Sequence, residues 1–174
     1  VGRKEEHNLT EFVNQIIKKE EKANLFDISR LNIFSEQVRE HKKQLRELLL
    51  GIKKTGKTIV AVSAPAKGMT LLNYCEIDSS ILDFLTEKSS LKIGKYSPGA
   101  HIPIFPDEKL GEKEIDFALL LAWNFSKEIV NNNIKYLKRG GKFIIPIPAI
   151  KIISYRKKWK KLKLKLIIKI KEDL

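Results

Sequence analysis

The sequence predicts an α/β fold with a mainly parallel β-sheet, and three observations lead to this fold class. First, residues 59–62 and 115–122 are almost continuously apolar and rich in branched side chains, as is typical of strands buried on both faces. Second, these runs alternate with segments whose apolar residues recur at helical spacing. Third, the connections between them are short. Such an alternation is typical of strands joined by helices that cover the sheet.

Two helices are predicted before the first strand. Residues 9–17 carry large apolar side chains at helical spacing, and a second, longer stripe runs from Leu31 to Ile52. Asp27 or Ser29 is expected to cap the second helix. His41 lies on its apolar stripe, so we interpret it as a half-buried packing residue rather than a ligand.

The remaining elements follow in order after residue 58. We expect strands at 59–62, 84–86, 115–122 and 142–146, helices after residue 68 and after residue 126, and a short helical segment near 78–82. Asn124 or Ser126 is a candidate cap for the later helix, and Gly140 with Gly141 would end it. Residues 101–104 are too rich in proline for a central strand, and residues 106–108 can open one helical turn.

This order predicts a single α/β domain with a mainly parallel sheet. Its expected parts are leading helices at 1–54, an α/β core at 55–150 and a basic tail at 151–174. The first residues are Val and Gly rather than Met, which suggests a fragment or a processed product.

The positive charge is concentrated in the tail. The formal net charge is +13, and residues 151–174 hold ten Lys or Arg against two acidic residues. Between residues 161 and 171, apolar residues alternate with lysines, which predicts an edge strand whose lysines guard against further pairing. The basic run at 156–161 with Trp159 leaves a second interpretation open, in which the tail contacts nucleic acid or an anionic membrane.

Several classes of protein are not indicated. The single cysteine, Cys75, cannot form an internal disulfide or a cysteine-rich zinc site, and His7, His41 and His101 lack ligand spacing, so no metal site is predicted. No apolar run is long enough to span a membrane, and no signal peptide is visible. We therefore expect a cytoplasmic setting, and since the charge lies mainly in the tail, nucleic acid is not the expected partner of the core.

Residues 58–74 hold the strongest local motif. A buried strand gives way to small residues at 63–68, interrupted by Lys67, and a helix follows. A strand, a small-residue turn and a helix start together direct N–H groups toward an anion, and Lys67 adds a positive charge. The motif is also compatible with an ordinary tight turn. Glu87, at the end of the second strand, stands where dinucleotide folds bind a ribose hydroxyl, although such a residue is also common as a solvated charge.

Four segments in order resemble one family. These are Ala-Pro-Ala-Lys-Gly at 64–68 with Thr-Leu-Leu-Asn-Tyr at 70–74, Gly-Lys-Tyr-Ser-Pro-Gly-Ala-His-Ile-Pro-Ile at 94–104, Trp-Asn-Phe at 123–125, and Arg-Gly-Gly-Lys-Phe-Ile-Ile-Pro-Ile-Pro at 139–148. Together they resemble the C-terminal, Rossmann-like domain of S-adenosylmethionine-dependent sugar C-methyltransferases, which act on nucleotide-linked deoxysugars. The resemblance spans roughly residues 9–153 and implies a Rossmann-like, three-layer fold.

The sequence departs from the family pattern at several positions. Ala61 and Ser63 stand where glycines are usual, Glu87 replaces an aspartate, and Ser90 and Ala122 replace prolines. The part after Tyr155 resembles nothing in the family.

The resemblance implies that this domain binds substrate and that catalysis lies elsewhere. In such enzymes a zinc domain and an S-adenosylmethionine-binding domain precede it, and a base on that preceding domain removes a proton beside the sugar's keto group so that the enolate carbon attacks the donor methyl. The nucleotide-linked sugar would lie between the two domains. We therefore expect no catalytic residue, metal or cofactor on this chain itself. The expected substrate-binding residues are Ala64, Pro65, Ala66, Lys67, Gly68 and Asn73 near phosphate or nucleotide, and Tyr96, His101, Trp123 and Asn124 lining the cleft.

Each of these residues also has a structural interpretation. Trp123 can pack, Asn124 can cap a helix, His101 can orient its loop, and Tyr96 can cover the core. At the level of the whole chain, two alternatives stay open. One is a non-enzymatic binding module that uses the basic tail, and the other is an assembly surface formed by the apolar stripe at 31–52.

Overall fold

The computed structural model describes residues 10–111, 115–155 and 166–167. The chain divides into two compact units, residues 1–41 and 42–174. The predicted α/β, Rossmann-like fold is confirmed in the second unit, where helices cover both faces of a mainly parallel sheet.

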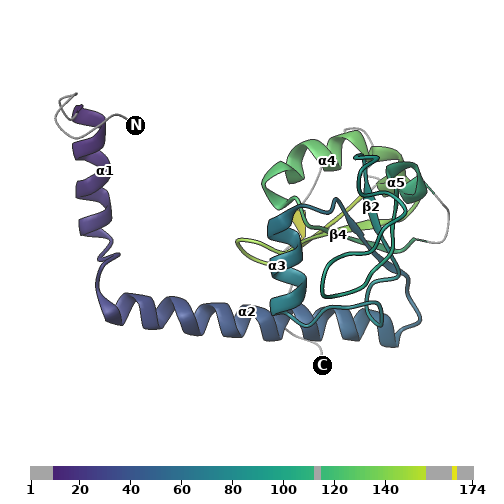
Figure 1. Cartoon of the computed structure of the whole chain (residues 1–174), viewed down its shortest axis with the longest axis horizontal. Coiled ribbons are helices and arrows are strands. Elements are labelled where there is room, and N and C mark those ends of the chain that lie inside the picture. The colour runs from purple at the N-terminus through teal and green to yellow at the C-terminus, as the bar shows by residue number, and fades with distance from the viewer. Residues whose placement is uncertain (1–9, 112–114, 156–165, 168–174) are drawn as a thin grey trace. The chain divides into compact units, whose positions relative to one another are not determined.

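The first unit contains helix α1 (Glu11–Lys22) and the start of helix α2 (Ile28–Lys54), joined by a turn (Figure 1). The Asp27 carboxylate accepts the N–H of Ser29 at 2.8 Å, which confirms Asp27 as the cap of α2. α1 has no buried residue, and Phe12, Phe26 and Phe34 are 69%, 81% and 62% exposed. The large apolar side chains of this first unit are therefore mostly exposed, whereas Leu45 and Leu49, further along the same stripe of α2, are buried.

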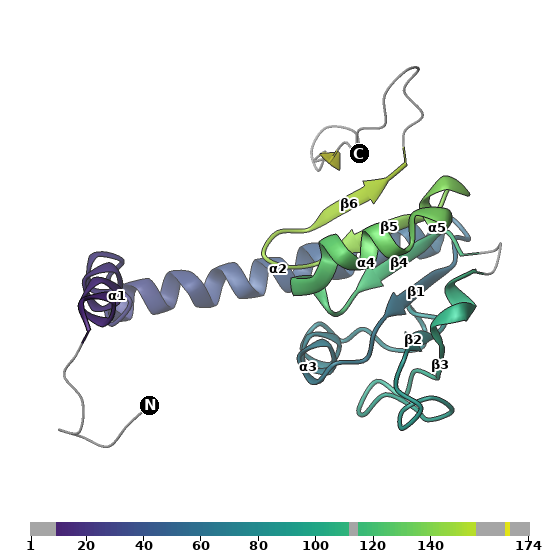
Figure 2. The ribbon, with the colours of Figure 1, turned by 90° about the horizontal axis from the view of Figure 1, so that it is seen from above.

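The sheet of the second unit has seven strands in the order β3-β2-β1-β4-β5-β6-β7 (Figure 2). The strands are β1 (Ile59–Val62), β2 (Leu85–Glu87), β3 (Ile104–Pro106), β4 (Phe117–Leu120), β5 (Lys142–Ile145), β6 (Lys151–Ser154) and β7 (Leu166–Ile167). The first five are parallel, and the last two are antiparallel to their neighbours. Strand β3 lies at one edge, where the proline-rich sequence around it is tolerated.

The strands are buried on both sides, as their continuous hydrophobicity predicts. In β1, Ile59 and Ala61 join the core beneath α2 and α3 (Ala66–Tyr74), whereas Val60 and Val62 join the core beneath α4 (Ser126–Asn132) and α5 (Ile134–Lys138). The other central strands alternate in the same way, because successive side chains of a strand point to opposite faces. Short 3₁₀ helices η1 (Asp107–Gly111) and η2 (Trp123–Phe125) follow β3 and β4.

Three local predictions need correction. The segment at 78–82 is a turn rather than a helix, because the Asp78 carboxylate accepts the N–H and the hydroxyl of Ser80 and so competes with helical bonding. The helix expected after residue 126 is two helices separated at Asn133. Neither Asn124 nor Ser126 caps α4, whose N-cap position is Phe125 without a side-chain bond.

The predicted tail begins inside the sheet. Residues 151–154 form β6, which pairs with β5 and buries Ile153, so the sheet extends into the segment that we expected to be a tail. Within the predicted edge strand, residues 166–167 pair with β6 as β7. The rest of that strand and the basic run at 156–161 lie outside the described residues. Among the described helices, none has the length and apolar character needed to cross a membrane.

Candidate functional site

The candidate site lies where β1 and β4 end side by side. These strands are adjacent and parallel, with Val62 opposite Leu120. From β1 the chain moves to β2 and β3 on one side of the sheet, whereas from β4 it moves to β5 on the other side. Ligands of open α/β sheets bind at such a switch point, outside the carboxyl ends of the strands. The residues predicted at 64–68 and 123–124 follow these two strand ends.

Lys67, Trp123 and Asn124 come together at this point. The Lys67 ammonium donates a hydrogen bond to the Asn124 side-chain oxygen and lies 4.7 Å from the centroid of the Trp123 ring. A cation held over an aromatic face is stabilised by the ring's quadrupole. The structure thus brings the positive charge of Lys67 to an aromatic ring and an amide that lie more than fifty residues further along the sequence.

The turn after β1 is held by a carboxylate. The N–H of Ala64 donates to Glu87 at 3.1 Å, and Ser63 adopts a positive φ of 70° just before it. The N–H groups of Gly68 and Met69 turn back to the carbonyl of Pro65. An anion approaching this turn would therefore meet the N–H groups at the start of α3, those of Ala66 and Lys67, together with the Lys67 side chain.

Glu87 fastens the turn to the loop that follows β2. Its carboxylate accepts the N–H groups of Lys88 and Ser89 at 2.9 and 3.3 Å, and the Lys92 ammonium at 3.2 Å. Lys92 also donates to the Ala64 carbonyl at 2.9 Å. Burial raises the pKa of Glu87, but these hydrogen bonds lower the pKa by more than burial raises it. The pKa of Glu87 therefore lies below its ordinary value of 4.5. The Glu87 carboxylate is therefore engaged by groups of the protein itself rather than simply solvated.

Gly68 has a packing role. A Cβ atom at this position would lie 2.7 Å from the Cβ of Leu121, just beyond β4. Only glycine lets the first turn of α3 approach the sheet this closely. The predicted substrate contact at Gly68 stays a prediction, but the close approach explains the residue without a ligand.

Asn73 links α3 to the loop at 96–101. Its amide donates to the carbonyl of Met69 at 2.8 Å and to that of Pro98 at 3.1 Å. Gly99 has a φ of 78°, and a Cβ there would lie 2.0 Å from the Asn73 side-chain oxygen. Asn73 thus positions the loop that carries two further predicted residues, Tyr96 and His101.

Tyr96 and His101 are presented by this loop at the surface. Tyr96 is 66% exposed, so it does not cover the core. His101 has a φ of 50°, and its N–H donates to the Ser97 carbonyl at 3.0 Å. Buried Ser97 closes the loop by accepting the N–H of Ile102 at 2.9 Å.

A pocket of about 260 Å³ opens at the same end of the sheet, which we call the carboxyl-edge pocket. It is lined by Val62, Ser63, Glu87, Lys88, Asp107, Ala122, Phe125, Glu128, Ile129, Asn132 and Asn133. Sequence patterns pointed to Glu87, and to Ser63 and Ala122 as departures from the family pattern, but not to Asp107, Glu128 or Asn132. A signal was present: Asp107 follows the end of β3, and Glu128 and Asn132 lie one helical turn apart on α4.

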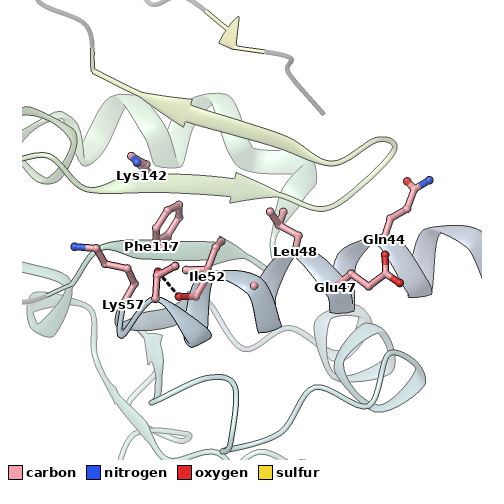
Figure 3. Close-up of a pocket in the computed structure, with 9 residues that line it drawn as sticks. Gln44, Glu47, Leu48, Ile52, Lys57, Phe117 and Lys142 are labelled. Atoms are coloured by element: carbon pink, nitrogen blue, oxygen red, sulfur yellow. Dashed lines mark hydrogen bonds between the residues drawn. The ribbon is translucent and has the colours of Figure 1, made fainter. Parts of the chain in front are cut away.

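A second, larger hollow lies at the opposite end of the strands. This amino-edge groove, of about 620 Å³, is lined by Gln44, Glu47, Leu48, Gly51, Ile52, Thr55, Lys57, Phe117 and Lys142. Lys57, Phe117 and Lys142 gather at one end of it (Figure 3). Lys57 is paired with Asp116 at 2.8 Å, and the Lys142 ammonium lies 5.0 Å from the Phe117 ring centroid.

The turn after β1 departs in two ways from the pattern of dinucleotide-binding folds. Those folds keep the acidic residue after the second strand available for ribose and use glycines for close backbone approach. Here Glu87 is held by four donors, and Ala61 and Ser63 carry side chains. Within the described part of the chain, no group of three His, Cys, Asp or Glu side chains is placed to hold a metal ion.

Comparison with known proteins gives two findings. The sequence profile of the family described as C-methyltransferase C-terminal domain matches residues 1–148. The chain is also similar to the C-methyltransferase NovU of Streptomyces niveus, with 34% identity over 149 residues. That alignment covers 86% of this chain and 36% of the relative, so the chain spans about a third of the relative's length.

Proposed function

The chain belongs to the C-methyltransferase C-terminal domain family, and we propose that it binds and positions a nucleotide-linked deoxysugar for methyl transfer by a preceding domain. The observation that carries this proposal is the group formed by Lys67, Trp123 and Asn124 at the switch point of the sheet. It joins residues from two of the segments that resemble the family of sugar C-methyltransferases.

The chemistry of this group suits a diphosphate. Lys67 supplies a positive charge, and the N–H groups at the start of α3 point toward the same end of the sheet. The Asn124 amide and the Trp123 ring hold the ammonium in place before a ligand arrives. A held cation loses less side-chain entropy on binding an anion than a free lysine does.

The proposed role of the domain is binding and positioning. Fixing the substrate relative to a methyl donor lowers the barrier without any acid or base on this chain. S-adenosylmethionine would supply the methyl group from the preceding domain, and the resemblance implies a separate zinc domain before that one. The cytoplasmic setting stays a prediction.

The test is a calorimetric titration of the chain with thymidine diphosphate. We expect saturable binding that Lys67→Ala weakens about tenfold or more, since a hydrogen bond to a charged group contributes about 1.5–3 kcal/mol. Lys138→Ala, on exposed α5 surface, removes the same charge away from the site and serves as the control. Absence of binding by the parent chain, or equal affinities for the parent and Lys67→Ala, would overturn the proposal.

A further inference from the structure

The carboxyl-edge pocket differs in charge from the group around Lys67. Three carboxylates line it, those of Glu87, Asp107 and Glu128, against the single ammonium of Lys88. A diphosphate placed there would be repelled by the excess negative charge. The pocket therefore selects a part of the ligand that carries no negative charge and that donates hydrogen bonds.

We propose that the carboxyl-edge pocket binds the nucleoside half of the substrate, its base and pentose, while the diphosphate extends toward Lys67. This inference rests on the proposed function and adds the orientation of the ligand. Phe125, which lines the pocket, directly follows Asn124, the hydrogen-bond partner of Lys67. The two sites are thus joined by consecutive residues of η2.

Asp107 is the residue best prepared to take a hydroxyl or an N–H group. Its Oδ1 atom is buried and, among the described residues, has no hydrogen-bond partner. A buried acceptor without a donor is costly, and a donor from a ligand would remove that cost. Glu87 cannot take this role because its own carboxylate oxygens already hold the turn and the loop. Asp107, which follows the neighbouring strand β3, is therefore the acidic residue that would accept this hydrogen bond.

The other lining residues match a base and a pentose. Asn132 presents an amide, which can both donate and accept, as the edge of a nucleobase requires, whereas the Asn133 amide already donates to the Ile129 carbonyl at 2.8 Å and offers its oxygen as an acceptor. The Phe125 ring is 57% exposed and offers a stacking face. A volume of about 260 Å³ lies below the range of roughly 300–1,000 Å³ usual for whole drug-sized ligands, so the pocket is sized for one portion of a nucleotide-linked sugar.

The test separates the two halves of the ligand. Amide chemical shifts of the ¹⁵N-labelled chain are followed during titration with thymidine, with inorganic pyrophosphate and with thymidine diphosphate. We expect thymidine to shift residues 125–133 and Asp107, and pyrophosphate to shift Ala66, Lys67 and Asn124. Asp107→Asn should lower the affinity for thymidine and for thymidine diphosphate about fivefold or more, and should leave the affinity for pyrophosphate unchanged. Lys67→Ala should lower the affinity for pyrophosphate and leave the affinity for thymidine unchanged.

Two controls keep the result interpretable. Glu108→Gln neutralises the exposed neighbour of Asp107 that does not line the pocket and should change no affinity. Glu128→Gln alters an exposed lining residue, so it tests the pocket even if Asp107→Asn fails to fold. Thymidine diphosphate binding that depends on Lys67 but is unaffected by both pocket substitutions would overturn this inference and leave the proposed function standing. Absence of any thymidine diphosphate binding would overturn both.

Discussion

The two ends of the sheet differ in both size and chemistry. At the amino ends of the strands, the larger groove is walled by Leu48, Ile52 and Phe117, and its lysines are engaged with Asp116 and with an aromatic ring. At the carboxyl ends, the smaller pocket gathers carboxylates and amides beside a held lysine. Volume alone would favour the amino-edge groove as the ligand site, whereas topology and chemistry favour the carboxyl edge.

The difference follows from how the sheet is built. At the amino edge, α2 leads directly into β1, so side chains there serve to pack a helix on the sheet. At the carboxyl edge, the chain leaves β1 and β4 toward opposite faces, and the diverging loops leave a space that polar side chains line. The amino edge should therefore matter for stability, and the carboxyl edge for binding.

Phe117→Ala gives the largest expected effect and tests the amino edge. Phe117 is 9% exposed and packs in the core beneath α2. Its truncation should lower the free energy of unfolding by about 3–5 kcal/mol, measured by urea denaturation. The milder Phe117→Leu keeps the fold and should leave thymidine diphosphate affinity within about twofold of the parent. A large loss of affinity in Phe117→Leu would mean that the amino-edge groove belongs to the ligand site, and would contradict the assignment of binding to the carboxyl edge.

Gly68→Ala should have an intermediate effect on both properties. The added Cβ would collide with Leu121 at 2.7 Å and push α3 from the sheet, which should cost about 1–3 kcal/mol in urea denaturation and weaken thymidine diphosphate binding. Gly51→Ala is the matched control at the amino-edge groove, because nothing lies within 4 Å of its Cβ position. Because Gly51 lies inside helix α2, alanine at this position should raise the free energy of unfolding by about 0.5–1 kcal/mol. Equal effects of the two substitutions would contradict the packing role of Gly68.

Glu87→Gln should have the smallest effect, and that effect depends on pH. Because the pKa of folded Glu87 lies below 4.5, its carboxylate stabilises the fold at neutral pH and loses this contribution as the pH falls through the folded value. At pH 7 the free energy of unfolding of the variant should be about 1 kcal/mol lower than that of the parent, as measured by urea denaturation. This difference in the free energy of unfolding should disappear in acid. Glu128→Gln, at an exposed residue of the same pocket, should change the free energy of unfolding at pH 7 by no more than about 0.5 kcal/mol.

Much of the fold could be predicted because it depends on local pattern. The runs at 59–62 and 115–122 are continuously apolar since both faces of those strands are buried, and that property is visible in the sequence. Strand β6 was missed because its four residues precede the lysine-rich part, whose composition suggested a separate tail. The turn at 78–82 was missed because a single Asp78 side chain outweighs helical spacing there.

The candidate site was only partly predictable, for a related reason. The motifs around Lys67 and Trp123 are local, so both residues could be named, and the strand order then explains why they meet. The partners of Glu87 and the open acceptor of Asp107 depend on how separate loops lie against one another. Spacing along the chain carries no signal for such contacts. The substrate contacts proposed for the individual residues stay predictions.

The link between Asn73 and the loop at 96–101 has a consequence in entropy. One amide holds two carbonyls, those of Met69 and Pro98, and the glycine next to Pro98 fits against it. The loop's conformational freedom is therefore given up when the chain folds rather than when a ligand arrives. Tyr96 and His101 stand ready on a loop that is already ordered, so a partner meeting them would bind without the entropic penalty of arranging it.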